Sequence, residues 1–182
     1  MSTLPLLIAY SLTVFLSNAI AAERVYYIAA EEIIWDYAPS FPTNALTGKP
    51  FNESARVFVE KRPDRIGRKY LKAVYRAYTD DSFSTRRPHP VHLGVVGPII
   101  RAEVGDSIVV RFLNRTRFPM SVHPHGVFYD KASEGAPHAD GTSGKDKADD
   151  IIPPGARYTY RWDVPERAGP GPGDPSSIAW PD

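Results

Sequence analysis

Two histidines separated by one residue form the clearest metal-ligand pattern in the chain. They belong to the motif His123-Pro124-His125-Gly126. On an extended strand, residues i and i+2 point to the same side, with backbones about 6 to 7 Å apart. Two imidazoles placed in this way can share one metal ion or serve neighbouring ions, and imidazole suits copper, zinc, iron or nickel. By itself, however, this spacing more often belongs to two surface histidines.

A second candidate site is rich in oxygen ligands. Asp146, Asp149 and Asp150 lie within five positions, in a loop that also holds Lys145 and Lys147. Three carboxylates this close can chelate a hard cation such as calcium, with backbone carbonyls completing the coordination shell. The alternative is a solvated loop of mixed charge, and the spacing alone favours that alternative.

Other chemistries are excluded by composition. The 182 residues include no cysteine, which excludes a disulfide, a thiolate nucleophile, an iron–sulfur cluster and a blue-copper centre with a Cys ligand. The formal net charge of +1 argues against a bulk electrostatic interaction with nucleic acid or with an anionic membrane. No Ser/His/Asp spacing typical of nucleophilic catalysis is evident.

The elements that must position these residues read as short strands. Apolar or alternating runs are separated by Pro and Gly, and the clearest period-2 alternation covers residues 158–164. The stretch 65–78 fits a helix face or a strand, and its many basic residues read as a solvated face. The pattern predicts one all-β sandwich or barrel domain, with strands at 25–28, 33–35, 57–59, 94–100, 108–112, 121–129 and 158–164.

The first residues are typical of a secretory signal peptide. Residues 4–16 are almost all apolar or small, and the small-residue stretch Ala19-Ile20-Ala21-Ala22 follows soon after. This pattern predicts a leader over residues 1–21, cut near Ala21 or Ala22, and a secreted product. The run is shorter than the roughly 20 residues of a membrane-spanning helix, and no other segment is long enough. Two glycosylation sequons, at Asn52 and Asn114, agree with secretion.

Several longer stretches resemble one known family. They include Val25-Tyr26-Tyr27-Ile28, Pro63 to Tyr70 and Leu93 to Asp106, followed in order by the His motif and by Ser133-Glu134-Gly135-Ala136. Together they are similar to the multicopper oxidases of the ceruloplasmin and hephaestin type. The resemblance implies a cupredoxin-like (plastocyanin-like, multicopper oxidase type 3) Greek-key β-sandwich over residues 22–182. The A domains of coagulation factors V and VIII are non-oxidase relatives of this family.

The resemblance also assigns sites. It implies that His123 is a type 2 and His125 a type 3 ligand of a trinuclear copper cluster, which in the complete enzymes couples iron(II) oxidation to reduction of dioxygen. Matching positions for calcium and for a monovalent cation are also implied. The calcium positions are Lys131 (through its backbone carbonyl), Asp146, Asp149 and Asp150, and the monovalent-cation positions are Phe58, Gly67 and Tyr70.

Departures from the family pattern argue against a complete oxidase site in this chain. The family has a second H-x-H motif after the segment matching Ile178-Ala179-Trp180, where this sequence ends at Asp182, and its type 1 copper needs a cysteine. We therefore expect a sandwich that lacks its last strands, and a chain that is inactive without further cupredoxin domains. Two alternatives stay open. One is a secreted calcium-binding interaction module like a coagulation A domain, and the other is a small copper carrier that also uses His89, His92 or His138.

Overall fold

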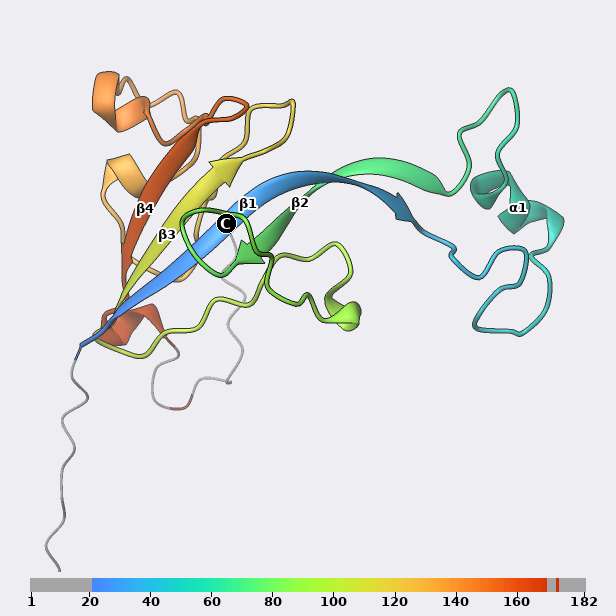
Figure 1. Ribbon diagram of the computed structural model, residues 1–182, viewed down its shortest axis with the longest axis horizontal. Coiled ribbons are helices and arrows are strands. Elements are labelled where there is room, and N and C mark those ends of the chain that lie inside the picture. The colour runs from blue at the N-terminus through green and yellow to red at the C-terminus, as the bar shows by residue number, and fades with distance from the viewer. Residues whose placement is uncertain (1–20, 170–172, 174–182) are drawn as a thin grey trace, which may run out of the picture.

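Four strands form the sheet that organises the molecule. The computed structural model describes residues 21–169 and 173, so the predicted leader, apart from Ala21, and residues 174–182 lie outside the described residues. Within this part the strands form one open sheet in the order β2-β1-β3-β4 (Figure 1). They span Glu23–Asp36 (β1), Lys69–Tyr78 (β2), Ser107–Asn114 (β3) and Arg157–Asp163 (β4).

The connections confirm the all-β class predicted from the sequence. β1 pairs antiparallel with β2 and parallel with β3, and β3 pairs antiparallel with β4. Such non-sequential neighbours are found in Greek-key arrangements. The other regular elements are short, and in the described part of the chain none is a helix long and apolar enough to cross a membrane. They are α1 (Glu53–Val59), η1 (Val91–Leu93), η2 (Lys131–Ser133), η3 (Gly144–Lys147) and η4 (Glu166–Ala168).

Side-chain alternation gives the sheet a core on each face. One cluster gathers the even-numbered residues of β1, β3 and β4, while the other lies on the opposite face, as the period-2 geometry of strands requires. Glu31 is buried beside the second cluster, where the Tyr78 hydroxyl and the Arg86 guanidinium bind its carboxylate. The first cluster contains Ile28, Ala30, Ile108, Val110, Phe112, Ile152, Tyr160 and Trp162, and the second contains Ala29, Tyr78, Phe83 and Leu113.

Beyond Glu31 the sheet narrows to a two-stranded ribbon. β1 pairs with β3 only from Glu23 to Ala30, whereas its pairing with β2 continues to Asp36. The ribbon therefore extends away from β3 and β4 and ends in the segment that carries α1 (Figure 1). Asn52 caps this helix, because its side-chain oxygen accepts a hydrogen bond from the Ala55 amide at 2.9 Å.

Several strand predictions are wrong in detail. The predicted strands 25–28 and 33–35 are one continuous strand, β1. Residues 57–59 lie in α1, because Asn52 provides an N-cap that a short apolar run does not reveal. The runs 94–100 and 121–129 form no strand, since each is broken by Pro and Gly. The ambiguous stretch 65–78 resolves as strand β2, and the predictions for β3 and β4 are confirmed.

Candidate metal centre

The two histidines of the motif lie side by side on the surface. Their ring centroids are 5.0 Å apart and the ring planes are nearly perpendicular, at 86°. They stand on an irregular segment and not on the extended strand expected from the sequence. Pro124 is buried between the two exposed imidazoles, so it fixes the segment to the body while both rings face outward. The segment begins at the isolated bridge between Met120 and Ile152.

One hydrogen bond selects which nitrogen of His123 faces a metal. Its Nδ1 lies 2.5 Å from the backbone carbonyl oxygen of Glu134. A carbonyl oxygen only accepts, so Nδ1 must carry the proton and donate. In the neutral imidazole, Nε2 then keeps its lone pair and is the nitrogen that can bind a metal ion. The contact is the kind of outer hydrogen bond that orients metal-ligating histidines.

Gly135 explains why the loop can approach the histidine segment so closely. This buried glycine has a φ of +69°, and a Cβ at its position would lie 2.1 Å from the carbonyl oxygen of Val122. Its amide donates to the Asp149 carboxylate at 2.7 Å. A short chain of contacts therefore runs from Asp149 through Gly135 and the Glu134 carbonyl to His123. Residue-type patterns alone did not identify this support, although Ser133-Glu134-Gly135-Ala136 was part of the family resemblance.

The acidic loop buries two carboxylates. The side chain of Asp149 is fully buried and that of Asp150 is 5% exposed. Each has a buried Oδ1 atom without a hydrogen-bond partner. The other oxygen of Asp150 pairs with the Lys147 ammonium at 3.1 Å, while Asp146 is half-buried on η3. Buried carboxylate oxygens without partners are costly, so this loop has unsatisfied acceptor capacity directed inward.

Lysine side chains neutralise the outer part of the same loop. The Lys131 ammonium contacts the carboxylates of Asp140 and Glu134. The hydrogen bond with Asp140, followed by that with Glu134, raises the pKa of Lys131. The same contact with Lys131 is the largest cause that lowers the pKa of Asp140. This arrangement draws the Lys131 side chain towards acidic neighbours, and a calcium ion in the loop would need its backbone carbonyl instead.

The described residues do not complete a metal site by themselves. Within residues 21–169 and 173, no group of three His, Cys, Asp or Glu side chains is placed so that it could hold a metal ion. The two neighbouring imidazoles fit a copper ion, because imidazole nitrogen is a suitable copper ligand, but they supply only part of a donor set. Further ligands would have to come from groups beyond these residues. For calcium, Oδ1 of Asp150 has no partner, whereas Lys147 contacts Oδ2.

The expected monovalent-cation residues lie far along the ribbon. Phe58 and Tyr70 line one surface depression, together with Arg68 and Lys72. The Lys72 ammonium sits 5.9 Å from the centre of the Tyr70 ring, so protein cations already occupy this region. Gly67 has a φ of +74°, and a Cβ there would lie 2.7 Å from the Lys61 amide nitrogen, which gives this glycine a backbone role.

The two sequons have opposite environments. Asn52 is exposed at the start of α1. Asn114 is fully buried at the end of β3, where its amide nitrogen donates to the carbonyls of Phe118 and Ile152 at 2.7 and 2.8 Å. Its side-chain oxygen accepts from the amide and the hydroxyl of Thr116. A glycan on Asn114 would have to break the bonds that its nitrogen makes.

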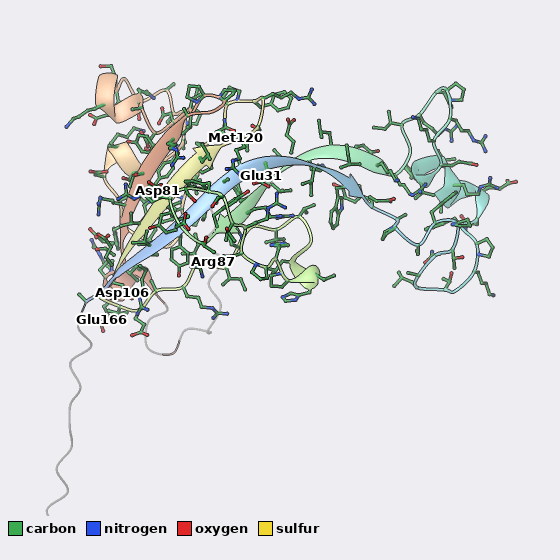
Figure 2. The ribbon with its side chains drawn as sticks, viewed as in Figure 1. Glu31, Asp81, Arg87, Asp106, Met120 and Glu166 are labelled. Atoms are coloured by element: carbon green, nitrogen blue, oxygen red, sulfur yellow. The ribbon has the colours of Figure 1, made fainter. Side chains whose placement is uncertain are left out.

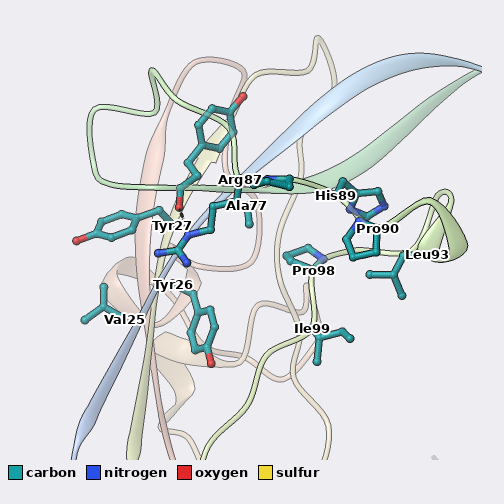
Figure 3. A pocket seen from close by; sticks show the side chains of 12 residues that line it. Val25, Tyr26, Tyr27, Ala77, Arg87, His89, Pro90, Leu93, Pro98 and Ile99 are labelled. Carbon is teal, nitrogen blue, oxygen red and sulfur yellow. Dashed lines mark hydrogen bonds between the residues drawn. The ribbon is translucent and has the colours of Figure 1, made fainter.

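The remaining histidines do not join the motif. The Nε2 atom of His89 lies 3.0 Å from the carbonyl oxygen of Gly94, and His138 pairs with Glu134 at 3.3 Å, while His92 is exposed on η1. His89 lines a pocket of about 250 Å³ between the start of β1 and the end of β2, shown in Figure 3. Arg87 lines the same pocket, and His89 is the one histidine among the described residues that line it.

Comparisons with known proteins identify the family. The multicopper oxidase family model matches residues 77–170. Ferroxidase HEPHL1 of Mus musculus is 52% identical over 162 residues, covering 88% of this chain and 14% of the relative. Hephaestin of Homo sapiens is 42% identical over 161 residues (87% and 14%), and ceruloplasmin of Ovis aries is 44% identical over 162 residues (86% and 15%).

A solved structure is also similar, though distantly. A multicopper oxidase from Pseudomonas thermotolerans gives a TM-score of 0.42 at 14% identity, covering 80% of this chain and 23% of that chain. The chain spans 14 to 15% of the length of the curated relatives described above. The family match includes the whole segment from the end of β2 to η4, and thus both histidines of the motif. The chain belongs to the multicopper oxidase family.

Proposed function

We propose that this chain supplies His123 and His125 as copper ligands to a ferroxidase of the ceruloplasmin and hephaestin type. The observation that carries the proposal is the paired imidazoles, 5.0 Å apart, with Nδ1 of His123 bound to the Glu134 carbonyl. The relatives include proteins named ferroxidases, which favours an oxidase over a coagulation-type interaction module. The remaining copper ligands come from other cupredoxin domains.

The chain's own residues orient the donors. Copper, when bound, supplies the electron transfer from iron(II) to dioxygen. The Glu134 carbonyl keeps the proton on Nδ1 of His123 and leaves Nε2 available. Pro124 anchors the segment in the body, and the Gly135 amide ties the supporting loop to Asp149. These contacts pre-organise the ligands, so that little conformational entropy is lost on metal binding.

Copper uptake by the secreted chain tests this proposal. We expect weakly held, sub-stoichiometric copper and no iron(II) oxidation by the chain alone. A His123→Ala/His125→Ala double variant should lose that copper, whereas His92→Ala, in an exposed histidine outside the motif, should keep it. Equal copper in the wild type and the double variant would contradict the ligand assignment. Loss of copper in His92→Ala would favour the copper carrier, and ferroxidase turnover by the chain alone would show that no further domains are needed.

A calcium ion in the acidic loop is a second candidate, as a structural ion within the same domain. The supporting observation is the pair of buried, unpartnered oxygens on Asp149 and Asp150. Calcium prefers carboxylate and carbonyl oxygens, and the position expected for it also uses Asp146 and the Lys131 carbonyl. Binding would give the orphan oxygens a partner, while Lys147 contacts the other oxygen of Asp150. A fixed ion here would stabilise the loop that supports His123.

Thermal unfolding with calcium and with a chelator tests this second candidate. Because a ligand that binds only the folded state stabilises it by mass action, calcium should raise the melting temperature of the wild-type chain. Asp150→Asn should abolish this rise, whereas Asp64→Asn, in an exposed carboxylate far from the loop, should retain it. No calcium effect on the wild type, or the same effect in Asp150→Asn, would refute the site.

A further inference from the structure

Ala22, the residue directly before β1, is hydrogen-bonded to Asp106 and to Ser107, the first residue of β3. The amide nitrogen of Ala22 donates to Oδ1 of Asp106 at 2.9 Å, and the Ala22 carbonyl accepts from the Ser107 amide at 3.0 Å. Ala22 is therefore held on both sides, just before β1 begins at Glu23. Asp106 lies at this end of the sheet, as Figure 2 shows.

Asp106 is a buried carboxylate that accepts hydrogen bonds from Arg24 and Glu103 as well as from Ala22. It is only 4% exposed, and its Oδ2 accepts from the Arg24 side chain at 2.7 Å and from the Glu103 amide at 2.9 Å. Arg24 is shared, since its guanidinium also lies 3.6 Å from the Glu103 carboxylate. Among the described residues, Arg24 is thus the one cation on this buried carboxylate, and the Ala22 nitrogen points at the same group.

The sequence places a processing signal at the same residue. A leader is cut after a small residue that is itself preceded, two positions earlier, by another small residue. Ala19-Ile20-Ala21 meets this pattern for a cut between Ala21 and Ala22. A cut after Ala22 would instead place the bulky Ile20 at the earlier position. The A-x-A spacing predicts that a cut would free the Ala22 nitrogen, and this is the nitrogen that contacts Asp106.

We propose that hydrolysis of the Ala21–Ala22 peptide bond creates an α-ammonium group that forms an ion pair with Asp106. Water supplies the hydroxyl that completes the Ala21 carboxylate and the proton that goes to the Ala22 nitrogen. The amine then takes a further proton from solvent at neutral pH. The catalyst is an endopeptidase of the secretory pathway. This proposal is independent of copper binding.

Processing and folding are linked by this contact. The bond from the neutral Ala22 amide to the Asp106 carboxylate becomes an ion pair between an ammonium and that carboxylate, so that both partners carry charge. The added charge balances the cluster of Arg24, Glu103 and Asp106. It also anchors the start of β1, the strand that joins β2 to β3. Other charged groups at this end of the sheet include the ion pair of Glu23 and Arg161. Asp163, Glu166 and Arg167 lie there as well.

The first test is the N-terminal residue of the chain secreted from cells that express it with its own leader. Intact mass and N-terminal sequencing should give Ala22 as the first residue. A mature chain that begins at Ala21, Glu23 or any other residue would overturn the proposal, because its amine would not lie at Asp106. A chain that keeps residues 1–21 would overturn it as well.

The second test measures the reactivity of the new amine. An adjacent carboxylate raises the pKa of an α-amine above its ordinary value near 7.7–8.0, and one unit lowers the unprotonated fraction about tenfold. Limiting acetic anhydride at pH near 7 should therefore acetylate the Ala22 amine about tenfold more slowly than in Asp106→Asn. A chain made with a different leader, so that it begins at Ala21, keeps Asp106 and serves as the control. Its amine should react at the ordinary rate.

Equal reactivity in the Ala22 chain and the Ala21 chain would show that no ion pair forms. Because the Ala21 control carries no substitution, this comparison does not depend on the folding of Asp106→Asn. Peptide mass spectrometry reads the acetylated N-terminal peptide separately from the lysines.

Discussion

The sheet body and the ribbon arm share strands β1 and β2, but only the body adds β3 and β4 to them. In the body (residues 23–30, 75–78, 107–114 and 157–163), both faces of the sheet are covered by side-chain clusters. In the arm (residues 33–72), large apolar side chains stay exposed: Ile34 is 66%, Phe58 75% and Leu46 96% exposed. The candidate metal centre and its supporting loops lie against the body.

The arm depends on surface contacts instead of a core. Arg56 pairs with Glu60 at 2.9 Å, Arg68 pairs with Asp36 at 3.1 Å, and the Arg68 guanidinium also lies over the Phe41 ring. Ion pairs that water can reach contribute little to stability, because solvent and salt screen them. Two strands alone can therefore carry a segment away from the body without giving it a stable interior. The positioning of metal ligands therefore falls to the part of the chain that has a packed core.

The largest expected contrast comes from truncating a phenylalanine in each region. Phe112 is 1% exposed in the main core, whereas Phe58 is 75% exposed on the arm. Phe112→Ala should lower the free energy of unfolding by about 3–5 kcal/mol, through lost burial and the cavity left behind. Phe58→Ala should change it by less than about 0.5 kcal/mol. Urea unfolding followed by the fluorescence of buried Trp162 measures both, and similar losses would remove the distinction between body and arm.

A glycine in the supporting loop should be nearly as sensitive. Gly135→Ala places a methyl group 2.1 Å from the Val122 carbonyl oxygen, at a positive φ. Overpacking and backbone strain should together cost about 2–4 kcal/mol. Gly141→Ala is the matched control, because Gly141 also has a positive φ, of +77°, but nothing lies within 4 Å of its would-be Cβ. It should cost only the strain, about 1 kcal/mol.

The same pair of glycine variants also tests the support of His123. If Gly135 holds the Glu134 carbonyl against His123, Gly135→Ala should weaken copper uptake while Gly141→Ala leaves it unchanged. Equal copper uptake in the two variants would show that the loop around Gly135 does not support copper binding at His123. Native mass spectrometry of the copper-loaded chains gives this comparison directly.

Much of the body was predictable from the sequence, and much of the arm was not. The alternation of Tyr158, Tyr160 and Trp162 with polar residues indicates β4, and the structure buries that face. The same rule fails at residues 57–59, where a local cap at Asn52 outweighs β-branched side chains. It also fails at 121–129, where Pro124 and Gly126 interrupt the run.

The candidate site was predictable in its residues but not in its support. Two histidines at i and i+2 are visible in the sequence, as are three nearby aspartates. The bond from His123 to the Glu134 carbonyl involves a backbone atom, which residue types do not reveal. Asp149 and Asp150 are buried, and the Tyr160 hydroxyl, from β4, donates to the Asp149 backbone carbonyl at 3.0 Å. Tertiary contacts of this kind have no local signature.

The two sequons provide a smaller contrast. Asn114→Gln should cost about 1–3 kcal/mol, because it disturbs a buried amide that bonds to two carbonyls and to Thr116. Asn52→Gln should cost about 1 kcal/mol or less, since it removes only an exposed helix cap. When cells secrete the chain with its own leader, we expect one glycan, on Asn52. Enzymatic deglycosylation should shift the mass of the wild type and of Asn114→Gln but not of Asn52→Gln, and a glycan on Asn114 would contradict the buried environment.

The smallest expected contrast is between two carboxylates whose pKa values lie below normal. Hydrogen bonds from the amides of Glu103 and Ala22, and then from Arg24, lower the pKa of Asp106 in the body. Hydrogen bonds from Arg56 and Arg62 lower the pKa of Glu60 on the arm. A depressed pKa in the folded state stabilises the protein above the unfolded pKa, near 4, and this stabilisation is lost as the pH falls through the folded pKa.

Asp106→Asn should therefore flatten the decline in stability between about pH 5 and about pH 2, while Glu60→Gln should alter it little. The reason is exposure: Asp106 is 4% exposed, so salt screens its contacts poorly, whereas the pairs of Glu60 lie on the surface and weaken as salt is added. Urea midpoints across this pH range, at low and at high salt, measure the difference. The contrary outcome is an acid-induced loss of stability that high salt removes and that is the same in the wild type, in Glu60→Gln and in Asp106→Asn. Acid sensitivity would then reside in surface charges of both regions, and the buried carboxylate of Asp106 would add nothing to the stability of the body.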